Sequence, residues 1–207
     1  MLKVVREYLS FAGVQYRNPD KAGDEREKML DLRQKGQEAR KSFTELAKTF
    51  QASHPEWKLQ QTSQWMNQAQ RLRPHFWAYL QRDGQVAEPM LALRLYGEGS
   101  DFGISLEVSF IERKKDEQTL DKQVKVLELP AVEEIYYLVY SNGESHKMEA
   151  NEENRRTLRE KLRNQEVRKV LVKSDVSFIE NQSVEAILEK LEEAYARLLP
   201  YYEVTRE

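Results

Sequence analysis

Acidic residues and a lysine near the middle of the chain have the side-chain types needed for metal-dependent hydrolysis. Asp101 precedes Glu112-Arg113-Lys114, and Glu107 lies between them. In metal-dependent nucleases a carboxylate and an acid-x-lysine on a strand hold Mg²⁺, and the lysine supports the attacking water. The pattern is short, and acid-x-lysine arises often by chance in a chain with 33% charged residues.

Strand geometry argues against a metal ion shared by Asp101 and Glu112. The two residues are eleven positions apart, and no turn signal lies between them. In one continuous strand an odd separation puts them on opposite faces, about 36 Å apart. A metal-dependent hydrolase or nuclease with carboxylates near the central strand is therefore the alternative hypothesis, not the leading one.

Other catalytic and cofactor patterns are missing from the sequence. There is no cysteine, which excludes disulfides, thiolate catalysis and zinc sites with sulfur ligands. His54, His75 and His146 are scattered, and none has a second histidine at metal-ligand spacing. Gly97 and Gly99 lie between two predicted strands, so they indicate a turn and not a dinucleotide fingerprint. We predict no catalytic residue, no metal site and no cofactor.

Polar and aromatic side chains alternate with aliphatic ones along the predicted strands, and alternation places them on opposite faces of a sheet. One face is aliphatic. The candidate ligand-binding residues share the other face, and they are Trp77, Tyr79, Arg94, Tyr96, Glu107 and Tyr136. The same parity adds His75, Ser105, Ser109 and Tyr140. We call the surface formed by the six candidate residues the polar–aromatic face.

The polar–aromatic face has two interpretations. Flat aromatic area with a few orienting polar groups suits a small ligand, and it also suits stacked bases. Alternatively, helices cover this face and the aromatic rings belong to the core, and the large helical content favours this interpretation for most of the aromatic residues. Arg94 and Glu107 need a partner if they are buried, and each can pair with the other across adjacent strands.

A basic stretch near the C-terminus also has two interpretations. Its cations are Arg155, Arg156, Arg159, Lys161, Arg163, Arg168 and Lys169, and acidic residues are interleaved with them. The cations could grip the phosphates of a nucleic acid. Mixed charges more often make a solvated helix with weak ion pairs, and a net charge of −2 favours that interpretation.

The order of helical and strand patterns along the sequence predicts an α+β fold, in which a central antiparallel sheet is flanked by N- and C-terminal helices. We expect one domain over residues 1–207. Residues 1–72 are predicted to be helical, and residues 73–149 to be rich in strands. Residues 150–207 are predicted to be helical with one added strand.

Helix boundaries follow from apolar spacing, caps and breakers. Apolar residues recur at three- and four-residue intervals over 24–51, and Gly36 is expected to bend or split this helix. Asn151 is expected to cap a helix that ends near residue 165. Ser183 should open the last helix, and Pro200 should end it.

Strands are predicted from β-forming residues between turn signals. The expected strands are 74–81, 90–96, 102–111, 135–140, 147–149 and 167–172. Ser141-Asn142-Gly143-Glu144 predicts a hairpin turn, because asparagine and glycine tolerate positive φ.

The N-terminal residues 1–7 lack the apolar core of a signal peptide, and no apolar run reaches the length that spans a bilayer. We therefore expect a cytoplasmic protein without a membrane partner. A small ligand or a nucleic acid is the expected partner class, and a homodimer is left open.

Two passages resemble an uncharacterised family of lactic-acid and streptococcal bacteria. They are Arg73–Leu80 and Gly103–Lys115. Members of that family carry an inherited "glucose-6-phosphate 1-dehydrogenase" label, and the resemblance implies no established catalytic residues. A nicotinamide enzyme should show a dinucleotide-binding strand–glycine–helix unit, and this sequence has none.

The layout is also similar to the N-terminal recognition domain of McrB-like restriction proteins. The shared features are a helical start, the Pro55-Glu56-Trp57 segment, a strand after a proline, and a late helix that runs into residues 198–202. This similarity implies recognition of a modified base or another ligand without catalysis.

The leading hypothesis is thus a non-enzymatic binding or accessory domain that uses the polar–aromatic face. The metal-dependent hydrolase or nuclease is the second hypothesis. A third is a protein–protein interaction module whose outer helices make the contacts.

Overall fold

A seven-stranded antiparallel sheet forms the centre of the computed structural model, which describes residues 2–82, 89–98, 101–110, 117–178 and 182–206. The strands are β1 (Lys58–Leu59), β2 (Trp77–Gln81), β3 (Met90–Glu98), β4 (Asp101–Ser109), β5 (Tyr136–Ser141), β6 (Glu144–Glu149) and β7 (Lys169–Ser177). Their order across the sheet is β1-β2-β3-β4-β7-β5-β6. The last strand along the chain therefore lies between β4 and β5.

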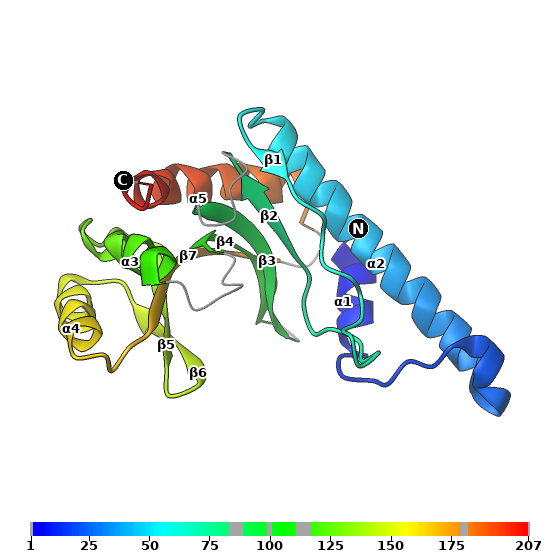
Figure 1. Ribbon diagram of the computed structural model, residues 1–207. Coiled ribbons are helices and arrows are strands. Elements are labelled where there is room, and N and C mark those ends of the chain that lie inside the picture. The colour runs from blue at the N-terminus through cyan, green and yellow to red at the C-terminus, as the bar shows by residue number, and fades with distance from the viewer. Residues whose placement is uncertain (1, 83–88, 99–100, 111–116, 179–181, 207) are drawn as a thin grey trace.

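Helices come before, between and after the strands. The α-helices are α1 (Leu2–Leu9), α2 (Arg26–Ala52), α3 (Glu117–Val124), α4 (Glu152–Arg163) and α5 (Val184–Val204). Short 3₁₀ turns are η1 (Pro19–Lys21), η2 (Gly23–Glu25) and η3 (Lys125–Leu127). Figure 1 shows α2 beside the β1–β2 end of the sheet and the β5–β6 hairpin at the other end. The predicted α+β class, with a sheet flanked by N- and C-terminal helices, is confirmed.

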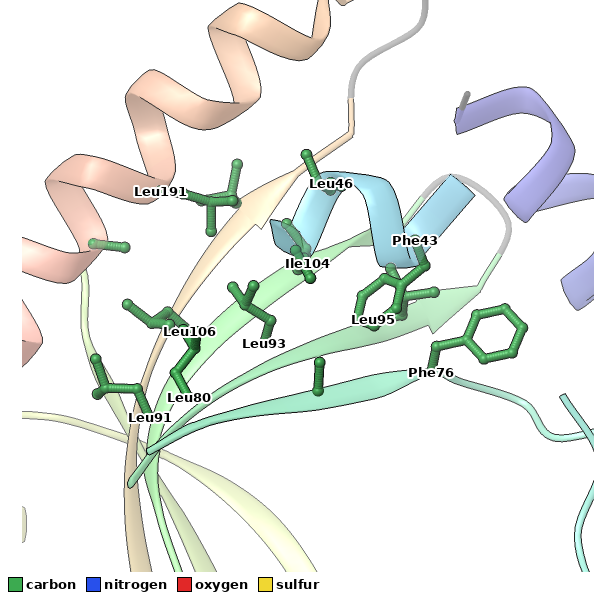
Figure 2. Close-up of a cluster of buried hydrophobic side chains, with 14 of the residues drawn as sticks. Phe43, Leu46, Phe76, Leu80, Leu91, Leu93, Leu95, Ile104, Leu106 and Leu191 are labelled. Carbon is green, nitrogen blue, oxygen red and sulfur yellow. The ribbon is translucent and has the colours of Figure 1, made fainter. Parts of the chain in front are cut away.

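The core lies between the aliphatic face of the sheet and the helices α2 and α5. Along β4, Ile104 and Leu106 alternate with polar residues, and both side chains are fully buried. Figure 2 shows these side chains together with Leu46 of α2 and Leu191 of α5, which point toward them. Burial of apolar surface stabilises this packing by about 25 cal/mol per Å².

Several local predictions are confirmed. The Asn151 side chain accepts a hydrogen bond from the Asn154 N–H at the start of α4, and Ser183 accepts one from the Ala186 N–H at the start of α5. Each cap pairs an N–H that has no partner inside the helix. The β5–β6 turn has positive φ at Asn142 (52°) and at Gly143, as expected for a two-residue hairpin turn.

The prediction that Pro200 ends the last helix is wrong, because α5 continues to Val204. A proline inside a helix removes one hydrogen bond and costs about 3 kcal/mol. Pro200 lies on the exposed side of α5, whereas Tyr201 and Tyr202 just after it are buried. Burial of two aromatic rings offsets that cost, so the helix continues.

Two further differences concern the predicted helical segment 1–72. The segment includes the two-residue strand β1, which pairs with the outer edge of β2. Gly36 does not split its helix, since α2 runs unbroken from Arg26 to Ala52. Instead, Gly36 is where the ring of Trp65 approaches the helix: a Cβ there would lie 2.6 Å from Trp65 Cε3.

We expect Gly36→Ala to destabilise the fold, although alanine is the better helix former by about 1 kcal/mol. Overpacking against the Trp65 ring should cost about 1–3 kcal/mol and so cancel or exceed that gain. Urea denaturation of both proteins measures the difference, with exposed Gln37→Ala on the same helix as the control. A clearly more stable Gly36→Ala protein would mean that Trp65 moves aside at no cost.

Candidate functional site

The six candidate residues lie on one face of the sheet. Side chains directly opposite each other on neighbouring strands share a face. Trp77 pairs with Arg94, and Arg94 also pairs with Ser105 on β4. The other candidate residues follow the same register: Tyr79 is opposite Ala92, Tyr96 opposite Gly103, and both Glu107 and Tyr136 opposite Lys173. The parity prediction is confirmed, and the polar–aromatic face is the side of the sheet opposite α2 and α5.

A buried carboxylate stands at the centre of the polar–aromatic face. Glu107 is only 1% exposed. Its Oε1 accepts hydrogen bonds from Arg94 Nε at 3.2 Å and from Nη2 at 3.1 Å. Its Oε2 lies 3.1 Å from the Nζ of Lys173, which is itself 4% exposed. The predicted pair of Arg94 and Glu107 is thus confirmed, and Lys173 extends it to three charges.

Lys173 is a residue that sequence reasoning missed. The strand was predicted to end at residue 172, just before Lys173 and five positions too early, since β7 continues to Ser177. Valine occurs at positions 170, 172 and 176 and polar residues at 173, 175 and 177, so the apolar–polar period of two continues past the predicted end. That alternation was the available signal, but nothing in the sequence placed β7 beside β4.

The three charges stabilise one another. Burial alone would raise the pKa of Glu107, but the charges and hydrogen bonds of Arg94 and Lys173 outweigh it and hold that pKa below its usual value. Burial alone would lower the pKa of Arg94, yet Glu107 raises it. Both groups are therefore ionised at neutral pH, and the carboxylate fixes the position of the guanidinium.

Aromatic rings surround this charged centre. The Trp77 ring lies 5.3 Å from the guanidinium carbon of Arg94 and 4.8 Å from that of Arg73. Trp77, Tyr79, Arg94 and Tyr96 are all partly exposed. The Tyr96 hydroxyl lies 3.1 Å from the Ser177 hydroxyl, and burial raises the pKa of Tyr96. The face is thus neither fully covered nor freely solvated.

Tyr136 belongs to a second polar cluster on the same face. Its hydroxyl donates to Asp175 Oδ1 at 2.9 Å, and Lys147 Nζ lies 3.2 Å from Asp175 Oδ2. The same ammonium is 3.9 Å from the centre of the Tyr136 ring. Burial raises the pKa of Tyr136, and the negative charge of Asp175 raises it further.

A cleft of about 500 Å³ opens beside this second cluster. Its walls come from the start of β5, the end of β7, the β6 residues Lys147 and Glu149, and three residues of α5. Of the six candidate residues, only Tyr136 lines this cleft. Arg94 and Glu107 lie deeper along the sheet, so the structure brings the candidates onto one face but not into one cavity.

Part of the alternative metal site can be placed in the fold. Asp101 and Glu107 belong to the same strand and face the same side, but they are six positions apart, which is about 20 Å along a strand. Glu112 and Lys114 lie outside the described residues. Within the described ranges, no cluster of three or more acidic or histidine side chains has the geometry to hold a metal ion.

In the basic stretch, one arginine makes structural contacts and three others are exposed to solvent. Arg155 forms an ion pair with Glu152 at 2.7 Å and donates from Nη1 to the Leu127 carbonyl at 2.9 Å, so it ties α4 to η3. Arg156, Arg159 and Arg163 line a shallow surface depression of α4. These three exposed cations are outside the polar–aromatic face, because α4 lies over the opposite side of the β5–β6 hairpin: Leu158 of α4 and Val139 of β5 line one small pocket there.

Among the described residues, no helix is both long and apolar enough to cross a membrane. The resemblances to the lactic-acid and streptococcal family and to McrB-like recognition domains stay predictions. No protein-family model matches the chain, and a comparison with curated proteins finds no match.

Proposed function

We propose that this chain is a non-enzymatic binding domain whose polar–aromatic face holds a small flat ligand or a nucleobase. The observation that carries the proposal is the partial exposure of Trp77, Tyr79, Arg94 and Tyr96 around a fully buried Glu107. Core aromatic residues of this chain, such as Phe76 and Tyr137, have no exposed surface. Residues that served only the core would be buried to the same extent.

Ring geometry favours a flat ligand. A partly exposed indole offers a surface on which any base can stack, because every base has a π-face. Arg94 and Arg73 both lie close to the Trp77 ring and would add cation–π contacts or hydrogen bonds to a ligand beside it. Sheets that present aromatic residues in this way are a common platform for unpaired bases.

The buried charges favour orientation over catalysis. Glu107 holds Arg94 through two nitrogen atoms, so the guanidinium loses little conformational freedom when it meets a ligand. Lys173 neutralises the second oxygen of Glu107, which leaves that carboxylate without a role as a general base. A fixed donor beside a stacking ring is what specific recognition of a heterocycle needs.

Replacement of Trp77 should weaken ligand binding without unfolding the protein. We expect Trp77→Ala to lower the affinity for a fluorescein-labelled single-stranded DNA dodecamer about 5- to 150-fold, because stacking is worth about 1–3 kcal/mol per base. Trp77→Phe keeps a flat ring and should retain most of the affinity. Fluorescence anisotropy measures these affinities, and calorimetry with the four nucleosides measures binding of the base alone.

The matched control is Arg159→Ala, which removes an exposed cation of α4 outside the polar–aromatic face. If phosphate attraction to the basic stretch drove binding, Arg159→Ala would weaken it and Trp77→Ala would not. That pattern would contradict the proposal, and so would the absence of binding to both the dodecamer and the nucleosides.

A further inference from the structure

Strand β7 extends past the end of its neighbour β5. On one side β7 pairs with β4 as far as Ser177, which is opposite Gly103. On the other side its pairing with β5 stops at Lys173, which is opposite Tyr136. Among the described residues, about four residues of this central strand, roughly 13 Å, therefore have no neighbouring strand on that side. We call this stretch, residues 174–177 of β7, the open edge.

The register shows which backbone groups face outward. The Phe178 N–H donates to the Phe102 carbonyl at 2.8 Å, so every second residue of β7, counted back from Phe178, bonds to β4. The residues between them turn their backbone groups to the opposite side. Lys173 directs these groups at Tyr136, whereas those of Asp175 and Ser177 have no backbone partner among the described residues.

Glu134 turns the chain away from the open edge. If β5 continued toward its N-terminus, Glu134 would lie opposite Asp175, but its φ of 60° takes the chain out of the strand. Two contacts support this conformation. The Ser174 hydroxyl donates to the Glu134 carbonyl at 2.9 Å, and the Glu134 carboxylate forms an ion pair with Arg197 of α5. Left-handed backbone at a non-glycine residue persists only where surrounding contacts hold it.

The cleft described above lies directly beside the open edge. Asp175, Val176 and Ser177 form one of its walls, and Lys190, Glu193 and Arg197 of α5 form another. An unpaired strand edge is a template for a further strand. Here it borders a cavity of about 500 Å³, so there is room for a segment of chain beside it.

We propose that the open edge binds an extended peptide segment of another protein, which adds to the sheet as a strand antiparallel or parallel to β7. Backbone hydrogen bonds to Asp175 and Ser177 would supply sequence-independent affinity. Side chains of the peptide would alternate between α5 and the Tyr136 side of the cleft. The site shares only Tyr136 with the polar–aromatic face, so it does not depend on the function proposed above.

The cleft is lined by four carboxylates and three cations, and one cation of the α5 wall gives the peptide a preferred chemistry at a single position. Arg197 already has carboxylate partners in Glu134 and Glu193, and Lys147 has one in Asp175. Lys190 is exposed and forms no ion pair with a described residue. An acidic side chain on the α5-facing side of the peptide would form an ion pair with Lys190, so we expect selected peptides to contain Asp or Glu.

A phage-displayed library of random linear heptapeptides, panned against the full chain, supplies the probe. The best peptide is then synthesised with single N-methyl groups at each backbone amide. Strand addition predicts an alternating result, in which methylation of amides that face β7 lowers affinity at least tenfold and methylation of the others changes it little. This measurement uses the unmodified protein and does not depend on the folding of any variant.

Variants of the protein test the same contacts. Ser177→Pro removes the outward N–H without touching a bond to β4, and it should lower peptide affinity at least tenfold. Ser177→Ala keeps that N–H and should bind within about twofold of the unmodified protein. Lys190→Glu should weaken binding of acidic peptides about tenfold through charge repulsion. Circular dichroism checks that each variant is folded.

Three results would overturn the proposal. The first is a library that selects no peptide, and the second is an N-methyl scan without alternation. The third is a Ser177→Pro protein that binds the peptide as tightly as Ser177→Ala does. Sedimentation that shows a concentration-dependent dimer, lost in Ser177→Pro, would assign the open edge to a second copy of this chain instead. If Trp77→Ala loses nucleoside binding but keeps peptide binding, the polar–aromatic face and the open edge are independent sites.

Discussion

Glu107→Gln should destabilise the protein by about 3–5 kcal/mol, which is the usual cost of breaking a buried ion pair from one side. The substitution keeps the shape of the side chain but leaves Arg94 and Lys173 without their anion. Lys173 has almost no exposed surface, so water cannot replace the lost partner. Urea denaturation at neutral pH measures the change in the free energy of unfolding.

The effect of Glu107→Gln should also depend on pH. The pKa of Glu107 is lowered in the folded protein, so its contribution to stability is complete above the unfolded pKa of about 4.3. That contribution is lost as pH falls through the folded pKa, because the protonated carboxyl resembles the neutral amide. The stability difference between the two proteins should therefore be constant near neutrality and should shrink below about pH 4.

Glu149→Gln is the matched control for this experiment. Glu149 is an exposed acid of β6, and we expect its replacement to change stability by no more than about 0.5 kcal/mol. If Glu107→Gln were as mild as this control at neutral pH, water or rearrangement would be satisfying the two cations. The buried charge centre would then have no role in fixing Arg94.

Leu191→Ala should lower stability by about 2–5 kcal/mol, because it opens a cavity where α5 packs on the aliphatic face. Leu191 has no exposed surface and points toward Ile104 and Leu106 (Figure 2). For a chain of this size such a loss corresponds to a decrease in Tm of roughly 5–15 °C. Differential scanning calorimetry measures it.

Glu189→Ala, on the exposed side of the same helix, is the control and should leave Tm almost unchanged. A small effect of Leu191→Ala would mean that α5 shifts to fill the cavity. In that case the α5 wall of the cleft would shift too, and peptide binding at the open edge should change in the same variant.

The two-sided character of the sheet could be predicted from the sequence, because it depends on local geometry alone. A strand turns successive side chains to opposite faces, so the alternation around Ile104 and Leu106 sorts β4 without knowledge of its neighbours. The helix caps Asn151 and Ser183 follow from equally local chemistry, since each pairs an N–H three residues away.

Predictions failed where a distant residue sets the outcome. Gly36 was expected to bend or split a helix, but the helix is not split, and the lack of a side chain at Gly36 makes room for Trp65, which lies far along the chain. Pro200 was expected to end a helix, but the burial of Tyr201 and Tyr202 extends it. In both cases tertiary packing outweighs a local preference of a few kcal/mol.

Composition and spacing thus determined the α+β class, the aliphatic face and the six residues of the polar–aromatic face. Only the tertiary structure decided that β7 lies between β4 and β5, which brings Lys173 against Glu107 and Asp175 against Tyr136. The same strand order creates the open edge, because β7 is longer than its pairing with β5. Strand order depends on which distant segments pair most favourably once the whole core is buried, and no local pattern in the sequence encodes that comparison.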